Sequence, residues 1–339
     1  MKFKGILALI LVVGLVFMSG SAKAVRQAAT MIDNQPGNGA IVYFQANTSG
    51  LGTVFSIFNT ASEDRTVHLI IKDQCSQYIN DVCLELSPNG AVHYGIFADA
   101  GGAYLRCING EGCQKGMAYI PDLKLDKDQN YRGYVNITEI QDCAHKDTPA
   151  YEVVKGESKP LNDLIVSAAL ITNDWWIGIN GFMIQGLRSG DLTADGQIKD
   201  EALPGGPNGK GRIAIGRWYN GQDPDAPGST EYVASLITIF PADRKPGKCE
   251  DCADAYRMKV LNYDDYQTEF SDKVEVKEVA STLLKDMLIP DWAGWIKITD
   301  IDNATSCGID NASMCGFILV EEKGGGNADA VPLFQNNLR

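Results

Sequence analysis

The segment DLTADGQI, from Asp191 to Ile198, has the residue types and spacing of half a calcium-binding loop. Carboxylates stand at its first and fifth positions, and the glycine that follows permits the sharp turn of such loops. The bidentate carboxylate of the last position is replaced by Ala202, so Glu201 or Asp200 would have to complete the oxygen shell. The alternative is an ordinary acidic turn without a cofactor. The candidate Ca²⁺ ligands are Asp191, Thr193, Asp195 and Glu201.

A second run of oxygen-bearing residues, DKDQN from Asp126 to Asn130, alternates in the same way. Tyr131 stands where the loop requires glycine, so this run is a weaker candidate for the same cation. A solvated acidic turn is again the alternative.

Nine cysteines follow residue 24, and eight of them lie in close pairs along the sequence. In an exported chain such pairs favour disulfides over free thiols, although the sequence leaves the connectivity open and Cys143 without a near partner. The C-x-x-C of the third pair has no following His and no second C-x-x-C, which favours a structural bridge over a redox or metal site. The pairs are Cys75 with Cys83, Cys107 with Cys113, Cys249 with Cys252, and Cys307 with Cys315.

Trp175, Trp176 and Trp218 are candidates for a flat aromatic platform that stacks against a sugar ring, with calcium nearby. The alternative is core packing. Because side chains alternate along a strand, the adjacent Trp175 and Trp176 are expected to point to opposite faces, with one of them inside.

No local pattern marks an active site. The histidines His68, His93 and His145 are scattered, and no G-x-S-x-G sequence surrounds a serine. Carboxylates are numerous enough for a glycosidase pair, but no spacing singles out two of them. We therefore expect no enzyme; a hydrolase would need a pocket with converging carboxylates, or a nucleophile near His68 or His93.

The first 24 residues have the parts of a secretory signal peptide. Lys2 and Lys4 precede an apolar run, and Ala22 to Ala24 form an A-x-A cleavage site. The apolar run, Gly5 to Met18, is shorter than the roughly 20 residues that span a bilayer, and no Cys follows it to accept a lipid. We expect an exported chain without membrane insertion after cleavage, extracellular or on the cell surface rather than periplasmic.

The charge balance argues against a nucleic-acid partner. The chain has 30 Lys and Arg against 43 Asp and Glu, and its net charge of −13 becomes −16 without the three lysines of the leader. Binding a polyanion requires a clustered basic face, and no run of Lys or Arg is present. Solubility explains an acidic surface, and cation binding is the alternative.

Hydrophobic alternation predicts strands along nearly the whole chain. In GAIVYFQAN (39–47), GTVFSIFNT (52–60) and RTVHLIIKD (65–73), β-branched and aromatic residues alternate with small or polar ones between turn residues. Similar runs return after residue 163, and only 277–288 has a helical repeat. This pattern predicts an all-β fold of two antiparallel β-sandwich (Ig-like) domains stapled by local disulfides.

Composition suggests the domain limits. The polar stretch 146–162 contains two prolines and is typical of a linker. The stretch 186–231 is dense in Gly, Pro and Asp, which predicts a long loop that either binds a ligand or is disordered. The expected order is signal peptide 1–24, N-terminal sandwich 25–145, linker 146–162, C-terminal sandwich 163–323 with the loop 186–231, and a flexible tail 324–339.

A series of short strand and turn motifs runs through the chain: Ile57-Phe58-Asn59-Thr60; Val67-His68-Leu69 with Asp73 and Ser76; Leu86-Ser87-Pro88 with Val92; Ile239-Phe240-Pro241; Tyr263-Asp264-Asp265 with Ser271; and Gly294-Trp295 before a glycine-rich end. This order resembles a group of uncharacterised secreted two-domain β-sandwich proteins of anaerobic Gram-negative bacteria. The resemblance implies an exported protein of the cell surface or extracellular matrix. The group has no agreed activity, so the resemblance implies no site residue.

The function expected from the sequence is that of an exported, non-enzymatic structural or adhesive protein. Its partners would be other surface proteins or glycans, and it would self-assemble where the edges of its sheets are exposed. The alternative is a β-sandwich module that binds calcium or carbohydrate. A secreted hydrolase is the third hypothesis.

Overall fold

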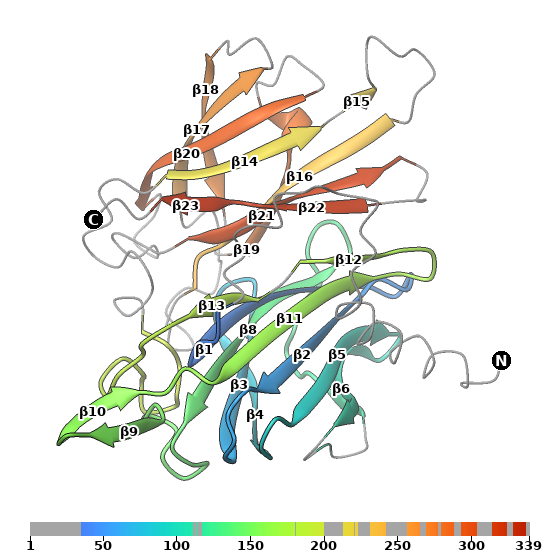
Figure 1. The fold of residues 1–339 in the computed structure, drawn as a ribbon. Helices are drawn as coiled ribbons and strands as arrows, with labels where there is room; N and C mark the ends of the chain where they lie inside the picture. Colours follow the sequence, from blue (N-terminus) through green and yellow to red (C-terminus); the bar gives the residue numbers. More distant parts are fainter. Residues whose placement is uncertain are drawn as a thin grey trace, which may run out of the picture. The chain divides into compact units, whose positions relative to one another are not determined.

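A computed structural model shows how the strands are arranged (Figure 1). The regular elements of its described residues are strands in antiparallel sheets, apart from the short 3₁₀ helix η2 at Leu284–Asp286. The all-β prediction is therefore confirmed. The structure describes residues 35–110, 113, 117–179, 181–199, 213–219, 221–222, 231–241, 256–264, 269–276, 279–287, 293–303, 314–323 and 328–336.

Two sheets and one separate hairpin are formed by the chain up to residue 184. The five-stranded sheet has the order β13-β1-β8-β3-β4, with β1 at Gly39–Ala46, β3 at Arg65–Asp73, β4 at Tyr78–Leu86, β8 at Tyr131–Ile140 and β13 at Phe182–Ile184. The six-stranded sheet has the order β12-β11-β2-β5-β6-β7, with β2 at Gly52–Asn59, β5 at Ala91–Asp99, β6 at Gly102–Gly110, β7 at Met117–Tyr119, β11 at Leu164–Ile171 and β12 at Trp176–Gly178. The β9–β10 hairpin consists of Tyr151–Val154 and Glu157–Pro160.

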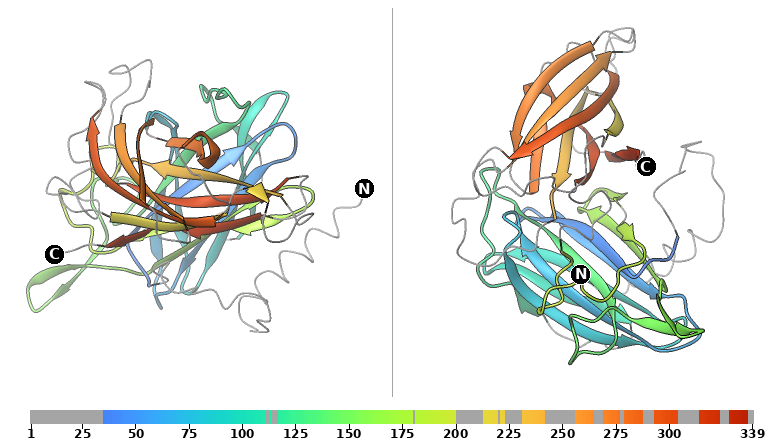
Figure 2. Two further views of the ribbon diagram at one scale, coloured as in Figure 1. Left: turned by 90° about the horizontal axis from the view of Figure 1, so that it is seen from above. Right: turned by 90° about the vertical axis from the view of Figure 1, so that its left-hand side faces the viewer.

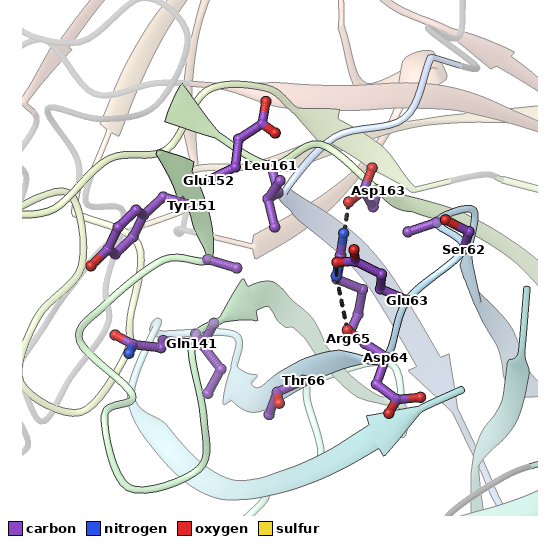
Figure 3. Close-up of a pocket in the computed structure, with 13 residues that line it drawn as sticks. Ser62, Glu63, Asp64, Arg65, Thr66, Gln141, Tyr151, Glu152, Leu161 and Asp163 are labelled. Carbon is purple, nitrogen blue, oxygen red and sulfur yellow. Dashed lines mark hydrogen bonds and ion pairs between the residues drawn. The ribbon is translucent and has the colours of Figure 1, made fainter. Parts of the chain in front are cut away.

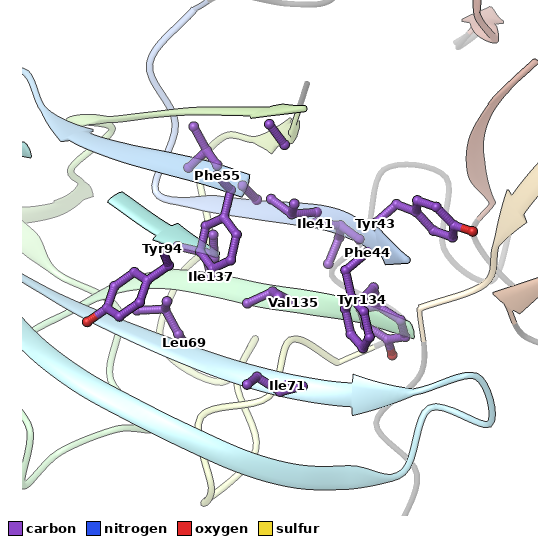
Figure 4. Packing of buried hydrophobic residues seen from close by; sticks show 14 of the residues in the cluster. Ile41, Tyr43, Phe44, Phe55, Leu69, Ile71, Tyr94, Tyr134, Val135 and Ile137 are labelled. Atoms are coloured by element: carbon purple, nitrogen blue, oxygen red, sulfur yellow. The ribbon is translucent and has the colours of Figure 1, made fainter. Parts of the chain in front are cut away.

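Buried side chains from both sheets form the first core (Figure 4). Phe55 of β2 stacks on Tyr94 of β5 with ring centroids 5.8 Å apart, and Leu69 of β3 and Ile137 of β8 belong to the same cluster. Strand β11, with the sequence LIVSAALI, alternates buried and half-buried residues along its length, as a strand with one face on a core does. Each buried Leu or Ile stabilises the fold by about 1.5–3 kcal/mol.

Two more sheets follow in the sequence, and they enclose a second core. The fully buried Trp218 lies in it, and Phe240 stacks on Tyr256 with centroids 4.3 Å apart. One sheet has the order β18-β17-β20-β14-β23, with β14 at Ile213–Tyr219, β17 at Tyr256–Asp264, β18 at Glu269–Val276, β20 at Ala293–Asn303 and β23 at Phe334–Asn336. In the other, β15 (Gly221–Gln222), β16 (Glu231–Ile239), β21 (Cys315–Glu322) and β22 (Ala328–Pro332) follow one another, and β19 (Val279–Leu283) pairs with β16.

The linker expected at 146–162 does not divide the sheets. It contains the β9–β10 hairpin, and the strands after it pair backward, β11 with β2 and β13 with β1. From Asn34 onward the chain is one compact unit, and its described strands form four larger sheets and a hairpin instead of the two predicted β-sandwich domains. The prediction failed because local composition reveals a turn but not which strands pair across it.

Other segments predicted as irregular also contain strands. The loop expected at 186–231 includes β14 and β15, and the flexible tail expected at 324–339 includes β22 and β23. The helical repeat at 277–288 contains β19, which pairs with β16 over five residue positions. Pairing with a neighbouring strand supplies the backbone hydrogen bonds, and this tertiary context outweighs a weak local preference.

The disulfides join more distant cysteines than the sequence suggested. The local Cys107–Cys113 bridge is confirmed, with a sequence separation of six. Cys83, however, bonds to Cys143, 60 residues away, so the predicted Cys75–Cys83 pair is wrong. Cys75 is disulfide-bonded as well. Strands β8 and β4 pair with opposite sides of β3, and the supposedly unpaired Cys143, which follows β8, bonds to Cys83 of β4.

Cys315 is a free thiol, so the predicted Cys307–Cys315 bridge is wrong, and burial raises the pKa of this thiol. Cys249, Cys252 and Cys307 lie outside the described residues, as does the predicted signal peptide, 1–24. Within the part of the chain that the structure describes, no helix has the length and apolar character needed to cross a membrane.

Candidate functional site

A hollow lies where the start of β3, the end of β8 and the base of the β9–β10 hairpin meet (Figure 3). Its volume is about 750 Å³, within the range of small-ligand sites. Arg65, the first residue of β3, lies in its wall, and we call it the Arg65 hollow. The lining residues are Ala61, Ser62, Glu63, Asp64, Arg65, Thr66, Ile140, Gln141, Ala150, Tyr151, Glu152, Leu161 and Asp163.

Acidic groups from three parts of the chain hold the guanidinium of Arg65. Its Nε donates to Asp163 Oδ2 at 2.8 Å and lies 3.1 Å from Glu139 Oε1. Its Nη1 donates to the backbone oxygen of Asp64 at 2.9 Å and to Glu63 Oε2 at 3.3 Å. Planar guanidinium groups suit such multiple contacts, so Arg65 ties the β2–β3 turn to the segment before β11.

Glu139 lies behind Arg65 with a fully buried side chain. Its Oε2 accepts a hydrogen bond from the backbone amide of Asp163 at 3.2 Å. Burial raises the pKa of Glu139 to about 7, and the charge of Asp163 adds to this effect while Arg65 opposes it. The carboxyl group therefore changes its charge near neutral pH.

The lining of the hollow is acidic overall. It contains the four carboxylates of Glu63, Asp64, Glu152 and Asp163 and the single cation of Arg65, so its formal charge is −3. Such a lining attracts a cation and repels an anion. No local sequence pattern marks this site, because Arg65 and Asp163 are 98 positions apart.

A second polar cluster surrounds His68, on the opposite face of β3 from Arg65. His68 Nε2 lies 2.8 Å from Asp81 Oδ2, Tyr78 donates to Asp81 Oδ1 at 2.6 Å, and Lys146 forms an ion pair with the same carboxylate. Burial alone would raise the pKa of Asp81, but these three partners outweigh it and lower the pKa to about 2. We call these four residues the His68 cluster.

The predicted calcium loop covers the His68 cluster. At Gly196, which has a φ of +80°, a side chain would lie 2.6 Å from His68 Nδ1. His68 is fully buried, and burial lowers its pKa although Asp81 opposes the shift. His68 Nδ1 has no hydrogen-bond partner among the described residues. The glycine that the calcium-loop pattern requires is thus explained here by a close approach to the imidazole.

The candidate calcium ligands are used in turn hydrogen bonds. Asp191 Oδ2 accepts from the backbone amide of Arg188 at 2.7 Å, and Thr193 Oγ1 accepts from that of Gln197 at 3.1 Å. Asp195 lies in the same turn, and Glu201 falls outside the described residues. Within the described ranges, no three His, Cys, Asp or Glu side chains gather as a metal site. Calcium binding at this loop stays a prediction.

In the second acidic run, a protein side chain provides the positive charge. Arg132 forms ion pairs with Asp126 and with Asp128, the latter at 3.2 Å, and only 10% of its side chain is exposed. Asp126 Oδ1 also accepts backbone amides of Asp128 and Asn130. The alternating oxygens therefore bind the guanidinium group of Arg132 where the sequence suggested a calcium ion.

The three tryptophans do not form one platform. Trp218 is fully buried in the second core, and Trp175 is half-buried against the first. Trp176, the first residue of β12, is 53% exposed. The expectation that one of the adjacent pair lies inside is confirmed in part, and the remaining exposed ring belongs to an outer strand.

A serine and a histidine meet on the six-stranded sheet. Ser56 of β2 lies opposite His93 of β5, and Ser56 Oγ lies 2.6 Å from His93 Nδ1. Burial lowers the pKa of His93, which favours the neutral imidazole that a general base requires. Among the described residues, no carboxylate forms a hydrogen bond or ion pair with this pair, and neither residue lines the Arg65 hollow.

Comparisons with known proteins provide no guide to these sites. No protein-family model matches the sequence, and no curated protein or solved structure is significantly similar to the chain. The resemblance to secreted β-sandwich proteins stays a prediction. The function must be argued from the side chains and strand edges described above.

Proposed function

We propose that this chain is an exported structural or adhesive protein, without catalytic activity of its own, that binds other surface components through its outer strands. The observation that supports this proposal is the placement of exposed apolar side chains. Most of the large ones among the described residues lie on strands that pair with another described strand on one side only. Those on outer strands are Met117 and Tyr119 of β7, Tyr151 and Val153 of β9, and Trp176 of β12; the others are Phe58 and Leu125.

Strands β7 and β12 are the two outer strands of the six-stranded sheet, and β9 belongs to a hairpin that pairs with no other described strand. In the left view of Figure 2 the green β9–β10 hairpin extends past the strands at its base. Outer strands have unpaired backbone groups, and soluble proteins usually protect them with lysine, proline or a covering loop. Exposed aromatic and aliphatic side chains instead favour the addition of a partner strand.

The proposal is tested with the purified mature chain. We expect it to sediment with the envelope fraction of the cells that produce it, or to form concentration-dependent oligomers in light scattering. A variant with Met117→Lys, Val153→Lys and Trp176→Lys should lose most of this binding. Phe58→Lys is the matched control because Phe58 is 36% exposed on the inner strand β2. A wild-type chain that stays a monomer and binds no envelope would contradict the proposal.

The Ser56–His93 pair favours a hydrolase as the second candidate function. A serine within 2.6 Å of a neutral imidazole has the first two groups of a nucleophilic centre. Incubation with a fluorophosphonate probe tests it, with Ser56→Ala as the control. Labelling that disappears in the variant would support the hydrolase, and an unlabelled wild-type chain would remove this candidate.

A further inference from the structure

The Arg65 hollow has an excess of negative charge that its own cation does not balance. Arg65 is shared among Asp163, Glu139 and Glu63. Asp64 and Glu152 also line the hollow with exposed carboxylates. An incoming cation could therefore bind these two carboxylates without displacing Arg65 from an ion pair.

Strand β9 borders this hollow and has an open edge. Tyr151 and Glu152, its first two residues, line the hollow, while Val153 is 66% exposed. The register pairs Glu152 with Lys159 and Val154 with Glu157, around a two-residue turn at Lys155 and Gly156 that has positive φ at both positions.

The backbone groups on that open edge come from alternate residues. The Leu161 amide donates to the Ala150 oxygen across the hairpin, whereas the Ala150 amide donates to the Glu139 oxygen of β8 at 3.1 Å. In the register of the hairpin, Glu152 and Val154 direct both of their backbone groups toward β10. The N–H and C=O of Tyr151 and Val153 then point to the other side, where no described strand pairs with β9. An extended chain can pair with these groups.

We propose that the open edge of β9 and the Arg65 hollow together bind an extended segment of a partner protein, with a lysine or arginine of that segment in the hollow. The partner strand would pair with Tyr151 and Val153, and its cation would lie in the acidic hollow that Glu152 of β9 and Asp64 line. This inference rests on the proposed adhesive function, for which it names one contact surface and the chemistry of its partner.

The first test uses a synthetic peptide as the partner strand. A fluorescently labelled Thr-Val-Lys-Val-Thr peptide is titrated with the full mature chain, and binding is followed by anisotropy. We expect saturable binding that weakens as salt rises, because the hollow is partly open to solvent. A peptide with norleucine in place of lysine should bind about tenfold more weakly. Equal binding of the two peptides would overturn the assignment of the cation to the hollow.

The second test removes the charges of the hollow while keeping the partners of Arg65. The double variant Asp64→Asn and Glu152→Gln should bind the lysine peptide about tenfold more weakly than wild type. Glu157→Gln is the matched control for the single variant Glu152→Gln: each removes one charge from an exposed residue of the same hairpin, but Glu157 does not line the hollow. If the control loses as much affinity as the single variant, the acidic surface as a whole attracts the peptide and the proposed site is wrong.

The third test examines strand addition. The same peptide, methylated on the backbone nitrogens of its two valines, keeps its lysine but loses donors for β9. We expect at least about a tenfold loss of affinity. Unchanged affinity would show that the side chain binds alone and would overturn the role of the β9 edge.

This inference and the proposed function fail separately. Suppose that the chain binds the envelope, but the lysine peptide does not bind and the charge variants have no effect on affinity. The proposed contact surface is then wrong and the adhesive function stands. If the lysine peptide binds as expected while the chain neither assembles nor binds the envelope, the site is correct and the adhesive function is wrong.

Discussion

The Arg65 hollow and the His68 cluster are built from the same kinds of residues around one strand, yet only one of them is open. Arg65 and His68 are three positions apart on β3, and each contacts carboxylates from other segments. Because their positions differ by an odd number, they lie on opposite faces of the sheet. The loop with Gly196 covers His68, whereas the base of β9 leaves the Arg65 side as a hollow.

The two clusters contain similar residue types, so the presence or absence of a covering loop decides which is a structural cluster and which is a candidate binding site. In the His68 cluster, the carboxylate of Asp81 has three side-chain partners from the same chain. In the Arg65 hollow, the lining carboxylates outnumber the one cation. Substitutions of covered groups, including the buried Glu139 behind Arg65, should therefore affect stability, and those of exposed residues that line the hollow should affect binding.

The largest effect is expected for Gly196→Ala. The new side chain would overlap the His68 ring and the Lys146 backbone, and the positive φ adds strain, so we expect a loss of about 2–4 kcal/mol of unfolding free energy. Gly190→Ala is the control, since Gly190 has a φ of +95° with no atom near the position of the new side chain, and should lose about 1 kcal/mol. Urea unfolding measures both, and equal losses would show that the loop does not hold His68.

The next effect is expected for Asp81→Asn, with a loss of about 1–2 kcal/mol once solvent screening is allowed for. The pKa of Asp81 is lowered to about 2, so its stabilisation is present above its ordinary value and is lost as the pH falls through 2. Acid unfolding followed by circular dichroism should show this loss for wild type. A variant with the same acid transition as wild type would contradict the role of Asp81.

Glu139→Gln should change the pH dependence in the opposite direction. Because the pKa of Glu139 is raised from 4.5 to about 7, its protonated form stabilises the fold at low pH, and this contribution is lost as the pH rises from 4.5 through 7. We expect roughly 1–3 kcal/mol from this group in wild type and a flatter profile in the variant. Thermal unfolding at pH values across this window measures it, and parallel profiles would contradict the assignment.

The smallest effect on stability is expected for Glu152→Gln on the open side. The side chain is exposed and forms no ion pair or hydrogen bond with another described residue, so the unfolding free energy should change by less than about 0.5 kcal/mol. Differential scanning fluorimetry beside Asp81→Asn gives the measurement. A loss as large as that of Asp81→Asn would mean that the two sides of β3 do not differ as described.

Much of the secondary structure was predictable, because alternation is a local property. The segments 39–47, 52–60 and 65–73 match β1, β2 and β3 closely. The helical repeat at 277–288 contains the short 3₁₀ helix η2 at Leu284–Asp286, but its first part is the strand β19, which is fixed by its pairing with β16. The tail and the long loop were missed since glycine and proline mark turns without excluding strands between them.

The candidate site was not predictable, because its residues come from distant parts of the sequence. Arg65 follows the β2–β3 turn, whereas its partners Glu139 and Asp163 come from the end of β8 and from the segment before β11. The pattern that the sequence did offer, the half-site at Asp191, lies instead in the loop that covers His68. Only a sharp turn with an obligatory glycine could be read from that pattern.

The sequence by itself determined the all-β class, most strand positions and the local Cys107–Cys113 bridge, since alternation and short spacing need no knowledge of partners. The tertiary structure decided which strands pair, which cysteines meet over 60 positions, and which cluster on β3 stays open. These outcomes depend on sheet order and register, because a strand edge or a carboxylate gains its role only from the segment that lies beside it or leaves it uncovered.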